Sequence, residues 1–311
     1  MLRRSQTFRQ RVRSELAAVK ADLDTVKVLT AQPLVQSIRE GRQFQSLHEA
    51  EFKVFSQFGD DGIIQYLIHR LSPLPDTFIE FGVEDYRESN TRFLLVNNNW
   101  RGLVMDASDE HIDYIHRDDI YWRHTLTARS AFITRDNINS LLRDAAFTGD
   151  IGLLSIDIDG NDYWVWDKID IVDPVIVIVE YNSIFGPSIA VTVPYDPTFV
   201  RHRAHYSGQF WGASLQAFVS LAERKGYSLV GCNSVGNNAY FIRNDKLGAD
   251  VPRLATAQAF IETRIRDSRD RAGQLTYLGS AERLSLIRDL NVYDLRQDKV
   301  GSLSSIMEAA L

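Results

Sequence analysis

Short apolar segments that alternate with helical patterns constrain the fold of this chain more than any other feature of its 311 residues. The strongest is DPVIVIVEYN at residues 173–182, in which five β-branched residues follow one another. The other apolar segments and the helical patterns around them cover residues 77–85, 102–108 and 151–160, and residues 62–71, 89–100 and 137–147. Continuous apolar strands between helices predict an α/β fold, doubly wound around a mainly parallel sheet that is covered on both faces.

A hairpin is expected to close this pattern. Residues 227–233 and 238–245 have the composition of strands, and the segment SVGN between them is typical of a tight turn. A helical pattern over residues 214–226, which ends in a glycine, precedes the hairpin. We therefore expect an antiparallel strand at the edge of the sheet.

The first thirty residues are expected to form one helix with an apolar seam. The seam consists of residues spaced three or four positions apart, namely Phe8, Val12, Leu16, Val19, Leu23 and Val26. The first turns are basic and carry Arg3, Arg4, Arg9, Arg11 and Arg13. This near-heptad spacing is compatible with a helix packed on its own domain, with a coiled coil that joins subunits into a homo-oligomer, and with a basic surface that makes peripheral contact with anionic lipid.

We expect this helix to be interrupted at Pro33 and to belong to an arm over residues 1–45. The main domain then covers residues 46–311. Its charged extension, from about residue 247, is expected to be helical, with a strand-like segment near Tyr293.

Charge and cysteine content exclude several classes of function. The chain has 35 basic and 41 acidic residues, and a net charge of -6 argues against broad nucleic-acid binding. Its one cysteine, Cys232, excludes an internal disulfide framework and a cysteine-based zinc cluster, and we expect it in the core. No apolar run approaches the roughly 18 residues of a membrane span, and the N-terminus lacks the apolar region of a signal peptide. We expect a soluble, cytoplasmic protein without a transmembrane segment.

A glycine and an acid stand at the ends of the first two predicted strands. Gly82 lies in EFGVED, where the missing side chain lets the backbone approach a ligand closely. Asp106 ends the second strand, where a carboxylate is placed to accept hydrogen bonds from both hydroxyls of a ribose. The alternative is that Asp106 only caps the next helix. The full GxGxxG pattern is absent, which disfavours a nicotinamide dinucleotide.

Three segments together resemble a known family. EFGVED (80–85), NTRFLLVNNNWRGLVMDAS (90–108) and LLSIDIDGNDYWVW (153–166) resemble the class I S-adenosylmethionine-dependent methyltransferases. Within that superfamily the chain is most similar to the FkbM-like and related polysaccharide-cluster methyltransferases, also in the upstream SQFGDDGII (56–64). The resemblance covers residues 52–245, although only Gly82 remains of the usual glycine-rich loop. It implies a seven-stranded Rossmann-like sheet and methyl transfer to an oxygen, often of a sugar.

The resemblance also implies which residues contact the cofactor, S-adenosyl-L-methionine. They come from the segment before the first strand, from the strand ends, and from the start of the helix after the first strand. These residues are Gln57, Phe58, Gly59, Glu80, Gly82, Asp85, Asn90, Thr91, Asp106 and Asp157. Asp106 would hold the ribose, and most of the others would surround the methionine part.

Acids at two further strand ends suggest a metal. Asp157 and Asp159 lie on the same side of an extended chain, as do Glu180 and Asn182 on the next predicted strand. Oxygen ligands of this kind suit Mg²⁺ or Mn²⁺ rather than zinc, and a divalent cation would lower the pKa of an acceptor hydroxyl. The alternative is that DIDGND is a turn whose Asp and Asn residues cap their own backbone.

The segment VRHRAHYSGQFWGAS (200–214) is expected near the acceptor. His205 is our candidate for the general base, since histidine titrates near neutral pH, while Asp157 and Asp159 would organise the acceptor. A structural histidine is the alternative. The candidate acceptor-binding residues are His202, Arg203, Tyr206 and Trp211.

The sequence, with this resemblance, thus predicts an S-adenosylmethionine-dependent O-methyltransferase that acts on a saccharide hydroxyl, and the resemblance suggests a role in surface polysaccharide biosynthesis. Two alternatives stay open. One is a non-catalytic scaffold with the same fold that acts through the N-terminal helix. The other is metal-dependent phosphoryl or glycosyl chemistry at the acids, although no phosphate-binding loop accompanies them.

Overall fold

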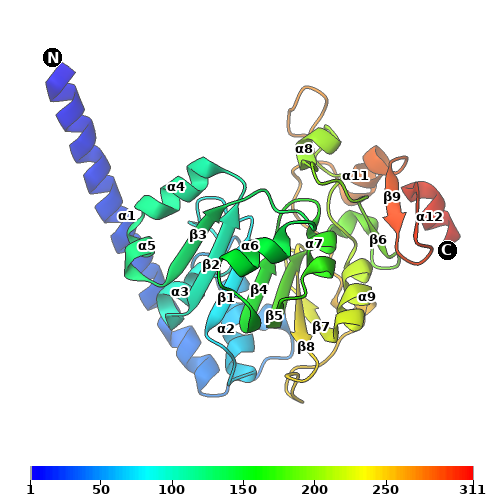
Figure 1. The fold of residues 1–311 in the computed structure, drawn as a ribbon, viewed down its shortest axis with the longest axis horizontal. Helices are drawn as coiled ribbons and strands as arrows, with labels where there is room; N and C mark the ends of the chain where they lie inside the picture. The colour runs from blue at the N-terminus through cyan, green and yellow to red at the C-terminus, as the bar shows by residue number, and fades with distance from the viewer. Residues whose placement is uncertain (1, 311) are drawn as a thin grey trace.

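The computed structural model describes the backbone of residues 2–310 and the side chains of residues 11–310, except residues 13, 14 and 17. Its centre is a seven-stranded sheet with helices on both faces (Figure 1). The strand order is β3-β2-β1-β4-β5-β8-β7. The bounds are Thr77–Phe81 for β1, Arg101–Asp106 for β2, Leu126–Ser130 for β3, Gly149–Ile156 for β4, Val172–Glu180 for β5, Tyr227–Cys232 for β7 and Asn238–Arg243 for β8.

The first five strands of this sheet are parallel, as the sequence predicts. The predicted hairpin is also present, but its antiparallel strand is not at the edge. β8 pairs antiparallel with both β5 and β7, so it lies second from the edge and β7 forms the edge. The prediction was wrong by one position because the second strand of the hairpin inserts next to β5.

Both faces of the sheet are buried, which explains the unbroken apolar runs. In β5, Val177 and Val179 pack with the helices of one face, and Ile176 and Ile178 pack with those of the other. The first face carries α6 (Ile138–Asp144), α7 (Asp162–Lys168) and α9 (Leu215–Lys225). The second carries α2 (Asp60–Arg70), α3 (Arg92–Asn98), α4 (Asp109–Arg117) and α5 (Asp119–Arg123). Cys232 is buried in the first of these layers, as expected.

Strand β3 was not recognised from the sequence. Its segment LTARS buries only Leu126 and Ala128, because β3 forms the other edge of the sheet. The short alternating pattern is the signal that sequence reasoning passed over. The strand matters because the residues that follow it reach the site described below.

Helix α1 spans Leu2–Arg39 without a break, contrary to the expected interruption at Pro33. Pro33 lies on the exposed side, while Ala31, Val35 and Ile38 are buried against the body on the other side. This packing holds the helix together across the one hydrogen bond that proline cannot donate. The N-terminal part of α1 projects beyond the body (Figure 1). No helix within residues 2–310 combines the length and the apolarity needed to cross a bilayer.

The chain after residue 247 is less helical than expected. It contains α10 (Thr256–Ala259), α11 (Ser280–Ile287) and α12 (Leu303–Ala309), but long parts of it have no regular structure. The strand-like segment near Tyr293 is confirmed as β9 (Asn291–Asp294). With β10 (Lys299–Ser302) and β6 (Val191–Thr192) it forms a separate three-stranded sheet.

Candidate active site

A cavity of about 500 Å³ opens at the carboxyl ends of the parallel strands. Residues at or just after the ends of β1, β2, β3, β4 and β5 line it. The strand order reverses between β1 and β4, and ligands of doubly wound sheets bind where it reverses. The cavity is therefore where this fold would hold a ligand.

Gly82 forms the floor between β1 and β4. Its φ is +74°, and a Cβ atom built on it would lie 1.6 Å from the backbone oxygen of Asp157. Any side chain would push the two strand ends apart. The need for glycine was expected, but the structure shows that its closest neighbour is the backbone of the adjacent strand.

Glu80 is buried and fixes the loop before α3. Its carboxylate accepts hydrogen bonds from the Ser89 hydroxyl at 2.6 Å, the Asn90 N–H at 2.8 Å and the Thr91 N–H at 3.0 Å. Burial raises the pKa of Glu80, and these hydrogen bonds lower it. Asn90 lines the cavity, whereas Thr91 is buried against Glu80 and does not. Glu80 and Thr91 thus position Asn90.

Asp106 lines the cavity at the end of β2, as predicted. Its Oδ2 accepts from the Glu84 N–H at 2.8 Å, and its Oδ1 accepts from the Ser108 N–H at 2.8 Å and contacts His111 Nδ1 at 3.1 Å. A carboxylate oxygen can accept two hydrogen bonds, so Oδ2 keeps room for another donor. The N-cap of α4 is Ser108 rather than Asp106.

An apolar wall adjoins Asp106. It consists of side chains at the ends of β2 and β3, namely Met105, Ala107, Ala131, Phe132 and Ile133. The residues after β3 were missed because that strand was missed.

The segment before the first strand contributes Gln57 only. Asp61 of α2 holds this loop, because its Oδ2 accepts from the N–H groups of Val54, Phe55 and Ser56 at 2.7–2.8 Å. Burial raises the pKa of Asp61 to about 6 despite these hydrogen bonds. Phe58 and Gly59, also predicted to contact the cofactor, are not among the residues that line the cavity.

Asp85 does not line the cavity either. It turns to Arg87, whose guanidinium and backbone N–H it binds. The Arg87 side chain accordingly lowers the pKa of Asp85 against the opposing effect of desolvation.

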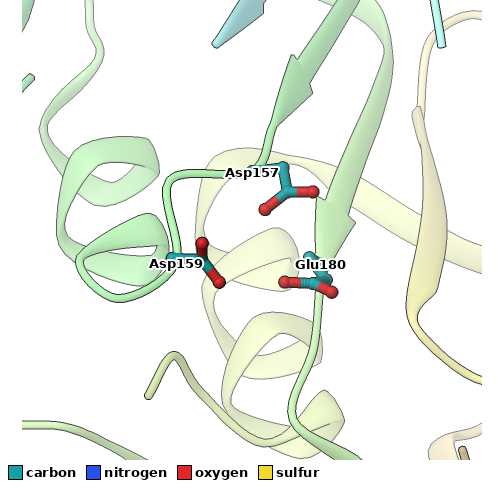
Figure 2. A group of neighbouring side chains, drawn as sticks. All are labelled: Asp157, Asp159 and Glu180. Carbon is teal, nitrogen blue, oxygen red and sulfur yellow. The ribbon is translucent and has the colours of Figure 1, made fainter. Parts of the chain in front are cut away.

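Asp157, Asp159 and Glu180 come together on the other side of the cavity (Figure 2). One carboxylate oxygen of each lies within 4.8 Å of the others. Burial and mutual repulsion raise the pKa values of Asp157 and Glu180 well above the usual range. Neither of these two carboxylates receives a hydrogen bond from an N–H group of the described residues.

DIDGND also forms the turn that was the alternative to a metal site, and the acid that closes this turn is Asp162 rather than Asp157 or Asp159. Asp162 accepts from the N–H groups of Ile158 and Gly160, both at 2.8 Å, and so closes the turn. This leaves Asp157 and Asp159 free to face the cavity. Asn161 lines the cavity as well, and its buried Oδ1 has no hydrogen-bond partner.

Asn182 is not available as a ligand, contrary to the prediction. Its amide donates to the carbonyl oxygens of Gln209 and Trp211, both at 3.0 Å, and its Oδ1 accepts from the Ile184 N–H at 3.1 Å. The side chain is buried and binds backbone in all three contacts.

Of the segment 200–214, only Arg201 lines the cavity. Its guanidinium lies 2.8 Å from Asp159 and 2.8 Å from Asp267, and it stacks on the Trp211 ring at 4.7 Å. The short helix α8 (Arg201–Ala204) directs this side chain toward the acids. The sequence pattern had favoured the histidines of the same segment.

The predicted base, His205, lies outside the cavity lining. Its Nδ1 is 2.7 Å from the Ser207 hydroxyl, and burial and Arg271 lower its pKa. Four predicted acceptor-binding residues are also absent from the lining, namely His202, Arg203, Tyr206 and Trp211. The structure does not bring these five residues to the cavity, and their roles stay predictions.

Residues from the hairpin were missed. Asn237 and Asn238 line the cavity, and the Asn238 amide donates to Asp60 at 2.9 Å. Asp60 also accepts from Asn233 and Tyr240. These residues reach the site because β8 pairs with β5. No pattern in the local sequence indicates that pairing.

The sequence matches no protein-family model and no curated protein. Three similar solved structures are the CurJ carbon methyltransferase, an O-methyltransferase from Bacillus cereus solved with S-adenosylhomocysteine, and the N-terminal domain of EvdMO1 solved with S-adenosylhomocysteine and D-fucose. Their identities are 8%, 14% and 9%, and their TM-scores are 0.39, 0.37 and 0.38. The matches cover 63%, 68% and 68% of this chain and 57%, 89% and 94% of the respective structures.

The fold follows from the strand order itself. Five parallel strands in the order β3-β2-β1-β4-β5, with the antiparallel β8 next to β5 and β7 at the edge, form a doubly wound, Rossmann-like sheet. The seven-stranded sheet that the resemblance implies is thereby confirmed.

Proposed function

We propose that this protein is an S-adenosylmethionine-dependent O-methyltransferase that acts on a saccharide hydroxyl. The observation that carries the proposal is the composition of one cavity. An apolar wall and a partly free carboxylate, Asp106, lie on one side of it, and three clustered carboxylates with Arg201 lie on the other. The first side suits a nucleoside, and the second suits a hydroxyl that must lose a proton.

In this proposal each part of S-adenosylmethionine has a candidate partner on the cofactor side. Met105 and Ile133 offer apolar surface to the adenine, and Asp106 offers Oδ2 to a ribose hydroxyl. Gln57 and Asn90 would bind the methionine part, on loops that Asp61 and Glu80 hold in place. When bound, the cofactor supplies an activated methyl group on a sulfonium.

The acceptor side is polar and offers both donors and acceptors. Asn161, Asn237, Asn238 and Arg201 can bind sugar hydroxyls, and Phe199 supplies an aromatic side chain. This chemistry favours a saccharide over an apolar acceptor. The same proposal places the protein in the FkbM-like group and in surface polysaccharide biosynthesis.

The proton acceptor in this proposal is Asp157 or Glu180 rather than His205. Both carboxylates line the cavity, and their raised pKa values make them better bases than an ordinary carboxylate. Asp159 is held by Arg201 at 2.8 Å and would position the acceptor.

As the alternative to a carboxylate base, we propose a divalent cation, Mg²⁺ or Mn²⁺, at Asp157, Asp159 and Glu180. Three carboxylates face one guanidinium there, so negative charge remains to be balanced. The unpartnered Oδ1 of Asn161, in the same cavity, is a further oxygen donor. A cation at this place would lower the pKa of an acceptor hydroxyl.

The cofactor assignment is tested by calorimetry with S-adenosylhomocysteine. We expect binding to the wild type and at least a roughly tenfold loss of affinity in Asp106→Asn, because a charge-assisted hydrogen bond contributes about 1.5–3 kcal/mol. Asp113→Asn, on the exposed side of α4, is the control and should bind as the wild type does. No binding by a folded wild type would overturn the cofactor assignment.

The reaction is tested by transfer of a radiolabelled methyl group to candidate glycans. Label in the glycan, lost in Asp157→Asn, is the expected result. Binding of cofactor without transfer to any hydroxylated acceptor would contradict the enzymatic proposal. For the metal, we expect chelator-treated enzyme to lose activity and to regain it with Mg²⁺ or Mn²⁺, and full activity in chelator would exclude the cation.

A non-catalytic scaffold is the second candidate, favoured by the exposed apolar side chains of α1. Removing residues 1–30 should then abolish function while Asp106→Asn preserves it. The arm over residues 1–45, the second copy of the chain as partner and the cytoplasmic location stay predictions.

A further inference from the structure

The N-terminal half of α1 leaves its apolar seam outside the body. The exposed fractions are 37% for Val12, 63% for Leu16, 55% for Val19, 56% for Leu23 and 56% for Val26. The Phe8 side chain lies outside the described residues. A continuous row of large exposed apolar side chains on one helix is typical of a surface that another chain covers.

A different stripe of α1 packs on the body. It includes Ala31, Val35 and Ile38, which are at most 4% exposed, and the partly buried Val28. At 3.6 residues per turn, the centre of the seam lies about 120° around the helix from this stripe. The sequence left three arrangements of this helix open. The first, in which the seam packs on its own domain, is therefore wrong.

The spacing of the seam is that of a coiled coil. Its five described residues are separated by four, three, four and three positions. This spacing places Leu16 and Leu23 at a positions, and Val12, Val19 and Val26 at d positions, of three successive heptads. We propose that the seam pairs with the same seam of a second copy of this chain, with the two helices parallel and in register.

The charges beside the seam specify this orientation. Between residues 15 and 27 the g positions are acidic, Glu15 and Asp22, and the e positions are basic, Lys20 and Lys27. In a parallel, in-register pair, each g residue faces the e residue of the next heptad on the other helix, so acids meet lysines. In an antiparallel pair g faces g and e faces e, so like charges would meet.

The body limits the assembly to two copies. Lys20 donates to the Tyr114 hydroxyl at 3.0 Å, and Lys27 lies over the Phe55 ring at 5.7 Å, so the e side of the seam borders the body. Leucine at a with a β-branched residue at d otherwise favours more than two strands, but one neighbour fits beside this flank more easily than two. The lysine ammonium groups have three donors each and can keep their present contacts.

Acidic g residues also argue against the lipid-surface alternative. Glu15 and Asp22 stand on the flank that faces away from the body, where an anionic membrane would approach. The seam covers about 21 Å of helix at 1.5 Å per residue. A pairing of this length is expected to be reversible, with a dissociation constant of roughly micromolar order.

The orientation is tested with the full chain by disulfide trapping. We expect Val12→Cys to form a covalent dimer on mild oxidation, because only a parallel, in-register pair brings two d positions of the same number together. Thr25→Cys, on an exposed face about 140° from the centre of the seam, is the control and should stay monomeric. The native Cys232 is buried and should not contribute. Trapping only in a chain that carries both Val12→Cys and Leu23→Cys, a d and an a position that face each other in an antiparallel pair, would overturn the proposed orientation.

The stoichiometry and the role of charge are tested by sedimentation. The wild type should form dimers, while the double variant Glu15→Lys, Asp22→Lys and the double variant Lys20→Glu, Lys27→Glu should each be monomeric, and a mixture of the two should dimerise again. A wild type that sediments as a monomer at about 100 µM would overturn the proposal, as would trimers or tetramers. Binding of that monomer to anionic vesicles would instead support the lipid surface. Circular dichroism of each variant controls for folding, which substitutions at exposed positions should not change.

Discussion

The carboxylates on the two sides of the cavity differ in the hydrogen bonds that they accept from the protein. On the β1–β2 side, Glu80 and Asp106 each accept at least two hydrogen bonds from backbone N–H groups or hydroxyls. The protein itself therefore stabilises their negative charge. On the β4–β5 side, Asp157 and Glu180 face each other without such donors. The first arrangement shapes a loop before any ligand arrives. The second stores repulsion that a proton or a cation would relieve, and reactive groups need that property.

The two sides of the cavity meet where the end of β1 contacts the end of β4. We expect the largest loss of stability from a substitution at this contact. Gly82→Ala should destabilise the protein by about 3–5 kcal/mol or prevent folding, because the added Cβ would meet the Asp157 carbonyl. Thermal unfolding measures this. Gly149→Ala is a matched control, since Gly149 has a similar φ of +72° but nothing within 4 Å of the added atom. It should cost about 1 kcal/mol, and equal losses in the two variants would show that the contact does not matter.

Neutralising one acid on the β4–β5 side tests whether the carboxylates there repel one another. Asp157→Asn is expected to raise the free energy of unfolding at neutral pH by about 1–2 kcal/mol, because it removes repulsion at Glu180. The same variant should lose methyl transfer. Asp289→Asn, whose side chain is 90% exposed, is the control and should change neither quantity. A loss of stability in Asp157→Asn would mean that the cluster is not repulsive.

The same cluster predicts the direction of the pH dependence. Folding raises the pKa values of Asp157 and Glu180, so the folded state binds more protons than the unfolded state. Their contribution to stability is present below the unfolded pKa values, near 4, and is lost as the pH rises through the raised folded values. Urea unfolding between pH 4 and pH 8 should show this loss in the wild type and a flatter profile in Asp157→Asn. A steeper fall in the variant would contradict the assignment.

The comparison also explains what could be predicted from the sequence. The buried strands were predictable because burial on both faces forces apolar residues to follow one another, as in residues 173–182. Gly82 and Asp106 were predictable because strand ends carry few other constraints. β3 was not, since an edge strand with only Leu126 and Ala128 buried carries a weak pattern.

Orientation within an irregular segment was the hardest to predict. His205 and Arg201 are four residues apart, and only the path of the chain around α8 decides that Arg201 faces the acids. Asn237, Asn238 and Asp267 reach the site through tertiary contacts that no local spacing records. The predicted site residues that lie outside the cavity lining are in or next to such irregular segments, where neither a two-residue nor a 3.6-residue period fixes the direction of a side chain.

The smallest effect is expected at the link between Arg201 and the C-terminal extension. Asp267 accepts from Arg201 at 2.8 Å and from Gln209 at 2.9 Å, and its side chain is 40% exposed. Asp267→Asn should therefore cost no more than about 1 kcal/mol of stability. Because Arg201 would be held less firmly beside Asp159, KM for the acceptor should rise a few-fold while cofactor affinity stays unchanged. Steady-state kinetics and calorimetry measure the two quantities, with the exposed Glu262→Gln as control. A change in cofactor affinity alone would place Arg201 on the wrong side of the cavity and so break the division between its two halves.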